Sequence, residues 1–369
     1  MLTLPDYPWD TLAPYRKLAA EHPDGVVDLS IGTPVDPTPA VIQDALRAAA
    51  DAPGYPGTHG TPALREAIAA WYVRRRRSPD LQAQDIMPTI GSKELVAWLP
   101  LFLGLGPGDI MVRPLVAYPT YDIGALLVGA ESIAADSLRD LTDDQRSRVK
   151  LVWTNSPGNP TGKVLDAAGL REIVDDARSL GAVVAADECY AELGWGDWEE
   201  HVPCILEPAV SGGDLTNLLS VYSLSKQSNV AGYRASFVAG APNLMPTLIN
   251  SRKHTGMIMP YPVQEALRVA ISDDAHVQVQ KDLYRARREA LKPALEAFGF
   301  SVHFSEAGLY LWCTAGKDSW ESIQDLAELG IIAGPGVFYG DAGAGFVRVS
   351  LTASDERIAS AVSRLTKRN

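Results

Sequence analysis

The sequence is poor in cysteine. Cys189, Cys204 and Cys313 are the only three among 369 residues, and no two of them stand in a C-x-x-C spacing. Their odd number and the missing spacing argue against a disulfide framework and against a zinc site. A chain of this length can bury a large core without such cross-links.

An excess of positive charge is also missing. The formal net charge is −12 at pH 7, and the one basic cluster is Arg74–Arg77. Nucleic acid is therefore not an expected partner, because binding its phosphates needs concentrated Lys and Arg. The cluster follows the apolar stretch Ala67–Val73, which predicts a solvated helix end where the helix dipole favours cations.

Long apolar runs are absent as well. No stretch of about 18 apolar residues occurs, so no spanning helix and no membrane partner is expected. The first residues, MLTLPDYPWDTL, have neither a basic region nor an apolar region typical of a signal peptide. These features predict a soluble, cytoplasmic protein.

What the chain does have is an alternation of short apolar runs with helical periodicity. Strands are expected at 26–34, 110–115, 149–156, 183–188, 217–225 and 235–240, and helices at 92–103, 119–129 and 167–180. Strands separated by helices predict an α/β fold with a mostly parallel sheet covered on both faces. After Pro262 a helical tract over 263–298, broken near 272–275, leads into an α+β pattern typical of a second domain.

The segment SVYSLSKQSNVAGYR (220–234) combines groups that can hold an aldehyde and a phosphate. Ser223 and Lys226 follow a predicted strand, at the edge where α/β sheets bind ligands. A lysine amine forms a Schiff base with an aldehyde, and hydroxyls and the Arg234 guanidinium suit a phosphate. Taken alone, a lysine after a strand is more often a solvated surface residue.

An acidic residue ends the apolar strand of VVAADECY (183–190). Asp187 would be costly there without a partner, and a protonated pyridine nitrogen is one such partner. Tyr190 lies three residues further and can reach the same ligand. Taken alone, Asp187 is better explained as a helix N-cap or a structural ion pair than as a cofactor contact.

Two turns complete the set. TNSPGNPTGK (154–163) has the composition of a plain turn, and it also places Asn159 where it can hydrogen-bond a cofactor. TIGSKE (89–94) is a Gly-Ser turn that opens a helix, and backbone amides at a helix start bind phosphate. A capping turn and a phosphate site are compatible here.

In this order, PGNPTG, DECY and SLSKQSNVAGYR resemble the class I/II aminotransferases, which are fold-type I enzymes dependent on pyridoxal 5′-phosphate (PLP). The resemblance covers essentially the whole chain. It implies a large PLP-binding domain at 36–275 with a mostly parallel seven-stranded sheet, and a smaller α+β domain at 276–369. Residues 1–35 would form an N-terminal arm and part of the small domain.

The resemblance also implies a role for each matching residue. Lys226 resembles the lysine that holds PLP as a Schiff base and carries the substrate proton, and Asp187 resembles the partner of the ring nitrogen. Tyr190 and Asn159 match the pair that hydrogen-bonds the 3′-oxygen, and Tyr118 is similar to the aromatic residue stacked on the ring. Phosphate-contacting positions are matched by Ser92, Lys93 (through its side chain or through its backbone amide alone), Ser223 and Arg234.

The substrate and the partner subunit are implied in the same way. Arg348, in GFVRVSL, resembles the arginine that binds the α-carboxylate of an amino-acid or 2-oxo-acid substrate, with Asn159 beside it. Gly32, in IGTP, matches the glycine that closes over the same group. Tyr55 resembles the tyrosine given to the neighbouring subunit's phosphate, which implies a homodimer with shared active sites.

The N-terminal text LPDYPWDTL, followed by HPDGVVDLSIGTPVDPTP, resembles actinobacterial N-succinyldiaminopimelate aminotransferases of lysine biosynthesis. Such a substrate carries carboxylates far from the reacting amine, so its site needs cations besides Arg348. Arg252, Lys253 and His254 are expected in a loop, which is either such a contact or a plain solvated basic loop.

Some alternative functions stay open, and others are disfavoured by the sequence. The motifs do not exclude an aspartate- or aromatic-type aminotransferase, or a PLP-dependent C–S β-lyase. A DNA-binding regulator with an aminotransferase-like domain is disfavoured, because no basic domain is present. A dinucleotide-dependent oxidoreductase is disfavoured too, because the glycine run at 104–108 follows a predicted helix and contains Pro107.

Overall fold

The computed structural model describes residues 4–367, and its largest element is a seven-stranded sheet with the order β2-β8-β7-β6-β5-β3-β4. The strands are β2 (Ile86–Ile90), β3 (Ile110–Arg113), β4 (Glu131–Ala134), β5 (Val149–Asn155), β6 (Val183–Asp187), β7 (Leu218–Ser223) and β8 (Ala235–Gly240). All neighbours pair in parallel except β8, which is antiparallel to both β2 and β7. The predicted α/β fold with a mostly parallel sheet is confirmed.

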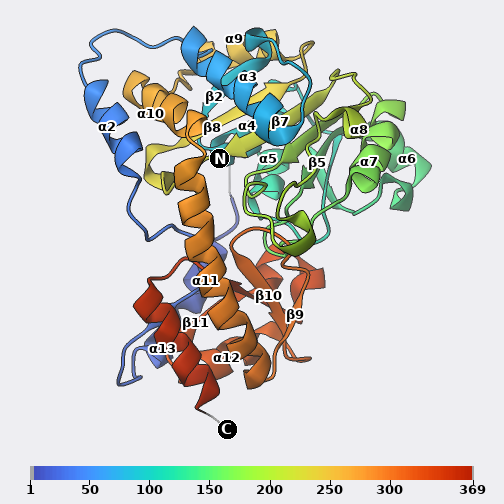
Figure 1. Ribbon diagram of the computed structural model, residues 1–369. Helices are drawn as coiled ribbons and strands as arrows, with labels where there is room; N and C mark the ends of the chain where they lie inside the picture. The colour runs from blue at the N-terminus through green and yellow to red at the C-terminus, as the bar shows by residue number, and fades with distance from the viewer. Residues whose placement is uncertain (1–3, 368–369) are drawn as a thin grey trace.

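Helices cover both faces of this sheet (Figure 1). In β6, Val183 and Ala185 pack toward one side and Val184 and Ala186 toward the other, because successive side chains of a strand alternate. The first side is covered by α4 (Ser92–Phe102), α5 (Thr120–Val128) and α9 (Met245–Thr255). The second is covered by α2 (Ala40–Ala48), α3 (Pro62–Arg76), α7 (Ala167–Ser179) and α10 (Tyr261–Ser272).

A second sheet is built from the C-terminal part of the chain. The helix α11 (Ala275–Phe298) runs from the large sheet to it (Figure 1). The strand order of this second sheet is β12-β13-β10-β9, and all neighbouring strands are antiparallel. These strands are β9 (Ser301–His303), β10 (Tyr310–Thr314), β12 (Gly334–Pro335) and β13 (Val347–Ser350), accompanied by α12 (Ser319–Glu328) and α13 (Asp355–Thr366). The break between α10 and α11 confirms the predicted interruption near 272–275.

The N-terminal segment packs on this C-terminal part. The short strand β1 (Val27–Asp28) pairs in parallel with β11 (Ile331–Ile332), and α1 (Ala13–Ala19) packs against α12. Two small helices, α6 (Asp143–Arg148) and α8 (Pro208–Ser211), lie at the outer side of the large sheet (Figure 1). Among residues 4–367, no helix is both long and apolar enough to cross a membrane.

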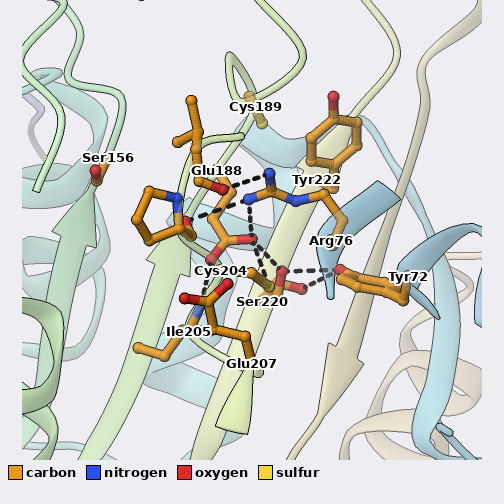
Figure 2. Close-up of polar contacts among 12 residues, drawn as sticks. Tyr72, Arg76, Ser156, Glu188, Cys189, Cys204, Ile205, Glu207, Ser220 and Tyr222 are labelled. Carbon is orange, nitrogen blue, oxygen red and sulfur yellow. Dashed lines mark hydrogen bonds and ion pairs between the residues drawn. The ribbon is translucent and has the colours of Figure 1, made fainter. Parts of the chain in front are cut away.

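The predicted solvated helix end at Arg74–Arg77 is wrong for one of its residues. Arg76 is only 1% exposed and pairs with Glu188 directly after β6, with 3.2 Å between guanidinium nitrogen and carboxylate oxygen. Figure 2 shows this pair inside the protein. The acidic partner lies 112 residues away in sequence, so the local pattern around α3 carries no sign of it.

Candidate active site

The residues predicted for the site gather around one cavity of about 250 Å³ at the carboxyl ends of β5, β6 and β7. Its lining includes all of them except Tyr55, namely Gly32, Ser92, Lys93, Tyr118, Asn159, Asp187, Tyr190, Ser223, Lys226, Arg234 and Arg348. The parallel strands bring these ends together, as expected for an α/β sheet. The lining comes from both sheets, because Arg348 lies on β13.

Lys226 lies three residues beyond the end of β7 and reaches into the cavity. Its Nζ donates a hydrogen bond to the carbonyl oxygen of Gly32. Burial lowers the pKa of the Lys226 amine, and the charge of Arg348 lowers it further, whereas Tyr310 opposes the shift. The amine is therefore more easily neutral than a surface lysine, as a nucleophile toward an aldehyde must be.

Asp187 ends β6 and is buried at the bottom of the cavity. Tyr121 Oη donates to its Oδ2 at 3.1 Å, and the backbone N–H of Cys189 donates to its Oδ1 at 3.3 Å. Burial raises the pKa of the Asp187 carboxyl, because few donors replace the lost water. A cationic N–H group of a ligand beside Asp187 would donate to the carboxylate and stabilise its charged form.

The start of α4 forms a cradle for an anion. Gly91 precedes the helix with φ +81°, and a Cβ there would lie 1.9 Å from a guanidinium nitrogen of Arg234. Only glycine therefore lets Arg234 lie across the helix start. The hydroxyls of Ser223 and Ser225, hydrogen-bonded at 2.8 Å, line the same cavity. Helix amides, hydroxyls and a guanidinium together suit a phosphate.

Arg348 is the buried cation on the opposite side of the cavity. Its Nη1 donates to Asn159 Oδ1 at 2.8 Å and its Nη2 to the carbonyl oxygen of Ser30 at 2.7 Å. The guanidinium lies 4.1 Å from the ring centre of Tyr310. Its Nε is buried and has no hydrogen-bond partner within residues 4–367. A buried donor without a partner is costly, and a substrate carboxylate is a suitable acceptor for it.

Two tyrosines share a hydrogen bond beside this arginine. The hydroxyl oxygens of Tyr190 and Tyr310 lie 3.3 Å apart. Burial raises the pKa of Tyr190, and Tyr310 adds to the effect. Burial alone would raise the pKa of Tyr310 as well, but Arg348 and Lys226 reverse the shift and lower it. The two hydroxyls therefore have pKa values shifted in opposite directions, by burial for Tyr190 and by the neighbouring cations for Tyr310.

Several lining residues lie outside the sequence prediction. Tyr310 comes from β10, which carries no PLP motif, and Tyr7 and Trp9 come from the N-terminal arm. The Lys93 side chain also lines the cavity, with Nζ 5.8 Å from the Tyr7 ring centre and 6.0 Å from that of Tyr118. The text LPDYPWDTL was a signal for the arm, but it gave no role to its aromatic residues.

The predicted loop at 252–254 is wrong. These residues form the last turn of α9, and Arg252 is fully buried against Glu94 of α4, with 2.6 Å between Nη1 and Oε1. The prediction failed because α9 has no amphipathic pattern and Glu94 is distant in sequence. Arg252 therefore has an acidic partner already and does not line the cavity.

The family model for aminotransferase class I and II matches residues 24–365. The chain belongs to this family. It is 52% identical over 366 residues to the 4-dedimethylamino-4-oxo-anhydrotetracycline transaminase OxyQ of Streptomyces rimosus, covering 99% of this chain and all of that protein. It is 51% identical over 364 residues to a probable aminotransferase of Mycobacterium tuberculosis, covering 99% and 86% of the two chains.

A solved structure agrees with this assignment. That of a probable N-succinyldiaminopimelate aminotransferase from Thermus thermophilus has a TM-score of 0.85 at 27% identity, covering 98% of this aminotransferase and all of the other chain. Class I/II aminotransferases of this fold use PLP. The cavity fits that cofactor, since it offers Lys226 for the aldehyde, Asp187 for the ring nitrogen and the cradle at Gly91 for the phosphate.

Proposed function

We propose that this aminotransferase moves the amino group of N-succinyl-LL-2,6-diaminopimelate to 2-oxoglutarate. The observation that carries the proposal is a pair of cations that both line the cavity, on opposite sides of it: the buried Arg348, with its unpartnered Nε, and the exposed Lys93 at the start of α4. Arg348 suits the carboxylate next to the reacting amine, and Lys93 suits a carboxylate further away. Both substrates carry carboxylates of these two kinds.

The residues around the cavity have distinct tasks in this reaction. Arg348 and Asn159 orient the α-carboxylate, which holds the substrate Cα–H next to Lys226. Lys226, once its amine is free, would take up the Cα proton at Nζ and hold it for its return. PLP, when bound, supplies the electron sink that makes this proton acidic. Asp187 keeps the ring nitrogen protonated, and the N–H groups at the start of α4 hold the phosphate in place.

In this proposal Lys93, rather than the segment 252–254, contacts the distal carboxylate of the substrate. Its Nζ lies over the rings of Tyr7 and Tyr118 at the edge of the cavity, and it makes no ion pair within the described chain. We expect Lys93→Ala to raise KM for the succinylated substrate about tenfold more than KM for alanine, which lacks a distal carboxylate. Lys253→Ala, at an exposed position of α9 outside the cavity, is the matched control and should change neither.

The test is a substrate panel with 2-oxoglutarate as acceptor, measured on both variants. Activity with the succinylated substrate and a selective KM effect of Lys93→Ala support the proposal. Turnover of aspartate or aromatic amino acids without any turnover of the succinylated substrate contradicts it.

A second candidate is the amination of a ketone on a planar polycyclic substrate. OxyQ, which is named as a transaminase of a 4-oxo-anhydrotetracycline, is 52% identical to this chain. Tyr7 and Trp9, stacked 5.2 Å apart, give the cavity an aromatic edge, and Trp9 Nε1 is buried without a partner in the described chain. The same panel with a polycyclic ketone as acceptor separates the two candidates.

A further inference from the structure

A buried carboxylate that the reaction does not use lies directly beside Asp187. Glu188 is only 2% exposed and follows β6. Because Val184 and Ala186 pack toward α3, the strand alternation turns Glu188 to that side of the sheet and Asp187 to the cavity side. Figure 2 shows Glu188 on the face turned to Arg76.

The Glu188 carboxylate has a full set of donors. Its Oε1 accepts the backbone N–H of Ile205 at 2.7 Å. Its Oε2 accepts the Ser220 hydroxyl at 2.8 Å and the Cys204 thiol at 3.3 Å, and pairs with Arg76 at 3.2 Å. Figure 2 shows all of these groups converging on the one carboxylate. Such a satisfied network holds its members in one arrangement.

The donors come from three different parts of the chain, in addition to the backbone pairing that already joins β6 and β7. Ser220 lies on β7, whose end leads to Lys226, and its hydroxyl also accepts from Tyr72 Oη of α3 at 2.8 Å. Arg76 donates to the carbonyl oxygen of Val202 at 2.9 Å and so fixes the segment before Ile205. Glu188 thereby joins α3, the segment 202–205 and β7 to the end of the strand that carries Asp187.

We propose that Glu188, held by Arg76 and Ser220, is a positioning residue that sets where the Asp187 carboxylate meets the cofactor ring. A buried ion pair is seldom the most stabilising choice for a core, since apolar residues can fill the same space. Its value here is geometric, because it fixes β6 and β7 relative to each other just before both deliver a residue to the cavity. The proposal does not depend on the identity of the substrate.

The test variant is Glu188→Gln, which keeps size and shape but removes the charge that holds Arg76. We expect the dissociation constant for PLP, measured by fluorescence, to rise about tenfold, because small misplacements of reacting groups have effects of that order or larger. We also expect the pH midpoint of the visible absorbance of the bound cofactor to rise. A ring that holds less positive charge repels the proton on the Lys226 nitrogen less.

Glu192→Gln is the matched control. Glu192 is also buried and also pairs with α3, through Arg75 at 2.6 Å, but within residues 4–367 its carboxylate makes no hydrogen bond or ion pair to β6 or β7. Both variants should lower the melting temperature of the apoprotein, and only Glu188→Gln should change PLP affinity and the pH midpoint. Equal changes in the two variants, or an unchanged cofactor in Glu188→Gln, would overturn the proposal.

Ser220→Ala keeps the proposal testable if Glu188→Gln does not fold. It leaves the ion pair intact and removes only the hydroxyl that ties Glu188 to β7. We expect a smaller rise in the PLP dissociation constant, about threefold, with the pH midpoint moving in the same direction. Wild-type values for both quantities in a folded Ser220→Ala protein would contradict the proposal.

Discussion

At the scale of single residues, burial and one buried cation, Arg348, shift the pKa values of neighbouring groups in the cavity. Burial lowers the pKa of the Lys226 amine, and Arg348 acts in the same direction. The same arginine lowers the pKa of Tyr310, although burial opposes it. Arg348 therefore has an electrostatic effect on the lysine in addition to its suitability for a carboxylate.

The pH dependence of PLP uptake tests this effect. Because only the neutral amine attacks the aldehyde, the rate at which the apoprotein takes up PLP should rise with pH through a midpoint below the ordinary pKa of lysine. Arg348→Met removes a charge that lowers this pKa, so its midpoint should lie higher than that of the wild type. Stopped-flow absorbance measures both, and an unmoved midpoint in Arg348→Met contradicts the assignment.

Asp187→Asn tests the contact with the ring nitrogen. An amide holds no negative charge to keep that nitrogen protonated, so kcat should fall by about 100-fold or more. KM for the amino acid should change little, because the carboxylate contact proposed for Arg348 is left unchanged. Tyr121→Phe removes only a donor to the same carboxylate and should cost about 1 kcal/mol of stability with a small change in kcat. Equal losses of kcat in the two variants would count against the contact.

Much of this cavity was predictable because its residues follow strand ends in recognisable motifs. Lys226 and Asp187 each come after an apolar strand, and parallel strands bring such ends together. Tyr310 was not predictable in this way, since it lies inside a strand of the second sheet, 120 residues from Tyr190. Arg252 was misplaced for the same reason, because its partner Glu94 is 158 residues away.

At the scale of elements, one arginine of α11 ties the helix to two distant segments. Arg287 is 3% exposed and donates to Asp36, with 2.8 Å from Nη1 to Oδ2, and to Asp355 at the start of α13, with 2.8 Å from Nε to Oδ1. Burial alone would raise the pKa of Asp36, but hydrogen bonds from Arg287 and Gln280 lower it overall. The charge of Asp36 therefore contributes to stability at neutral pH.

Arg287→Met should cost about 3 kcal/mol in the free energy of unfolding, because it leaves Asp36 partly buried without its cation. The folded-state pKa of Asp36 lies below its unfolded value, so the contribution is complete above the unfolded value and is lost as pH falls through the folded one. Urea unfolding at neutral and at acidic pH measures the free energy of unfolding of the wild type and of Arg287→Met. The difference in this free energy between the two proteins should shrink below about pH 4. A difference that grows in acid contradicts the assignment.

The elements that the sequence analysis missed have physical explanations. The strand β2 contains Pro88, which has no N–H to donate and is accommodated because β2 is the edge of the sheet. The other missed strand, β4, is short, lies at the opposite edge and is partly exposed, so it lacks an apolar run. Strands in the middle of the sheet were found because burial on both faces makes them continuously apolar.

At the scale of the whole molecule, Tyr55 is the one predicted site residue that does not line the cavity of its own chain. Its side chain is fully exposed and it lies outside the cavity. We propose that a second copy of the chain takes up this tyrosine at its phosphate cradle. Sedimentation should then show a dimer, and Tyr55→Ala should weaken PLP binding although no cavity residue of its own chain has changed.

Mixed dimers give the sharper result. Chains with Tyr55→Ala, which should bind PLP weakly, and inactive chains with Lys226→Ala should regain activity when refolded together at a limiting PLP concentration. One of the two sites then has an intact lysine and an intact tyrosine. Activity no higher than the sum of the separate variants would contradict shared active sites.

The most direct test of the account is chemical trapping of the cofactor on the protein. Borohydride reduction of the PLP-loaded enzyme, followed by proteolysis and mass spectrometry, should place the PLP-derived mass on the peptide that contains Lys226. Prior addition of an amino-acid substrate should decrease the amount of this labelled peptide, and no labelled peptide should form in Lys226→Ala. A label on another lysine of the cavity, such as Lys93, or no label on any peptide, would contradict the central claim.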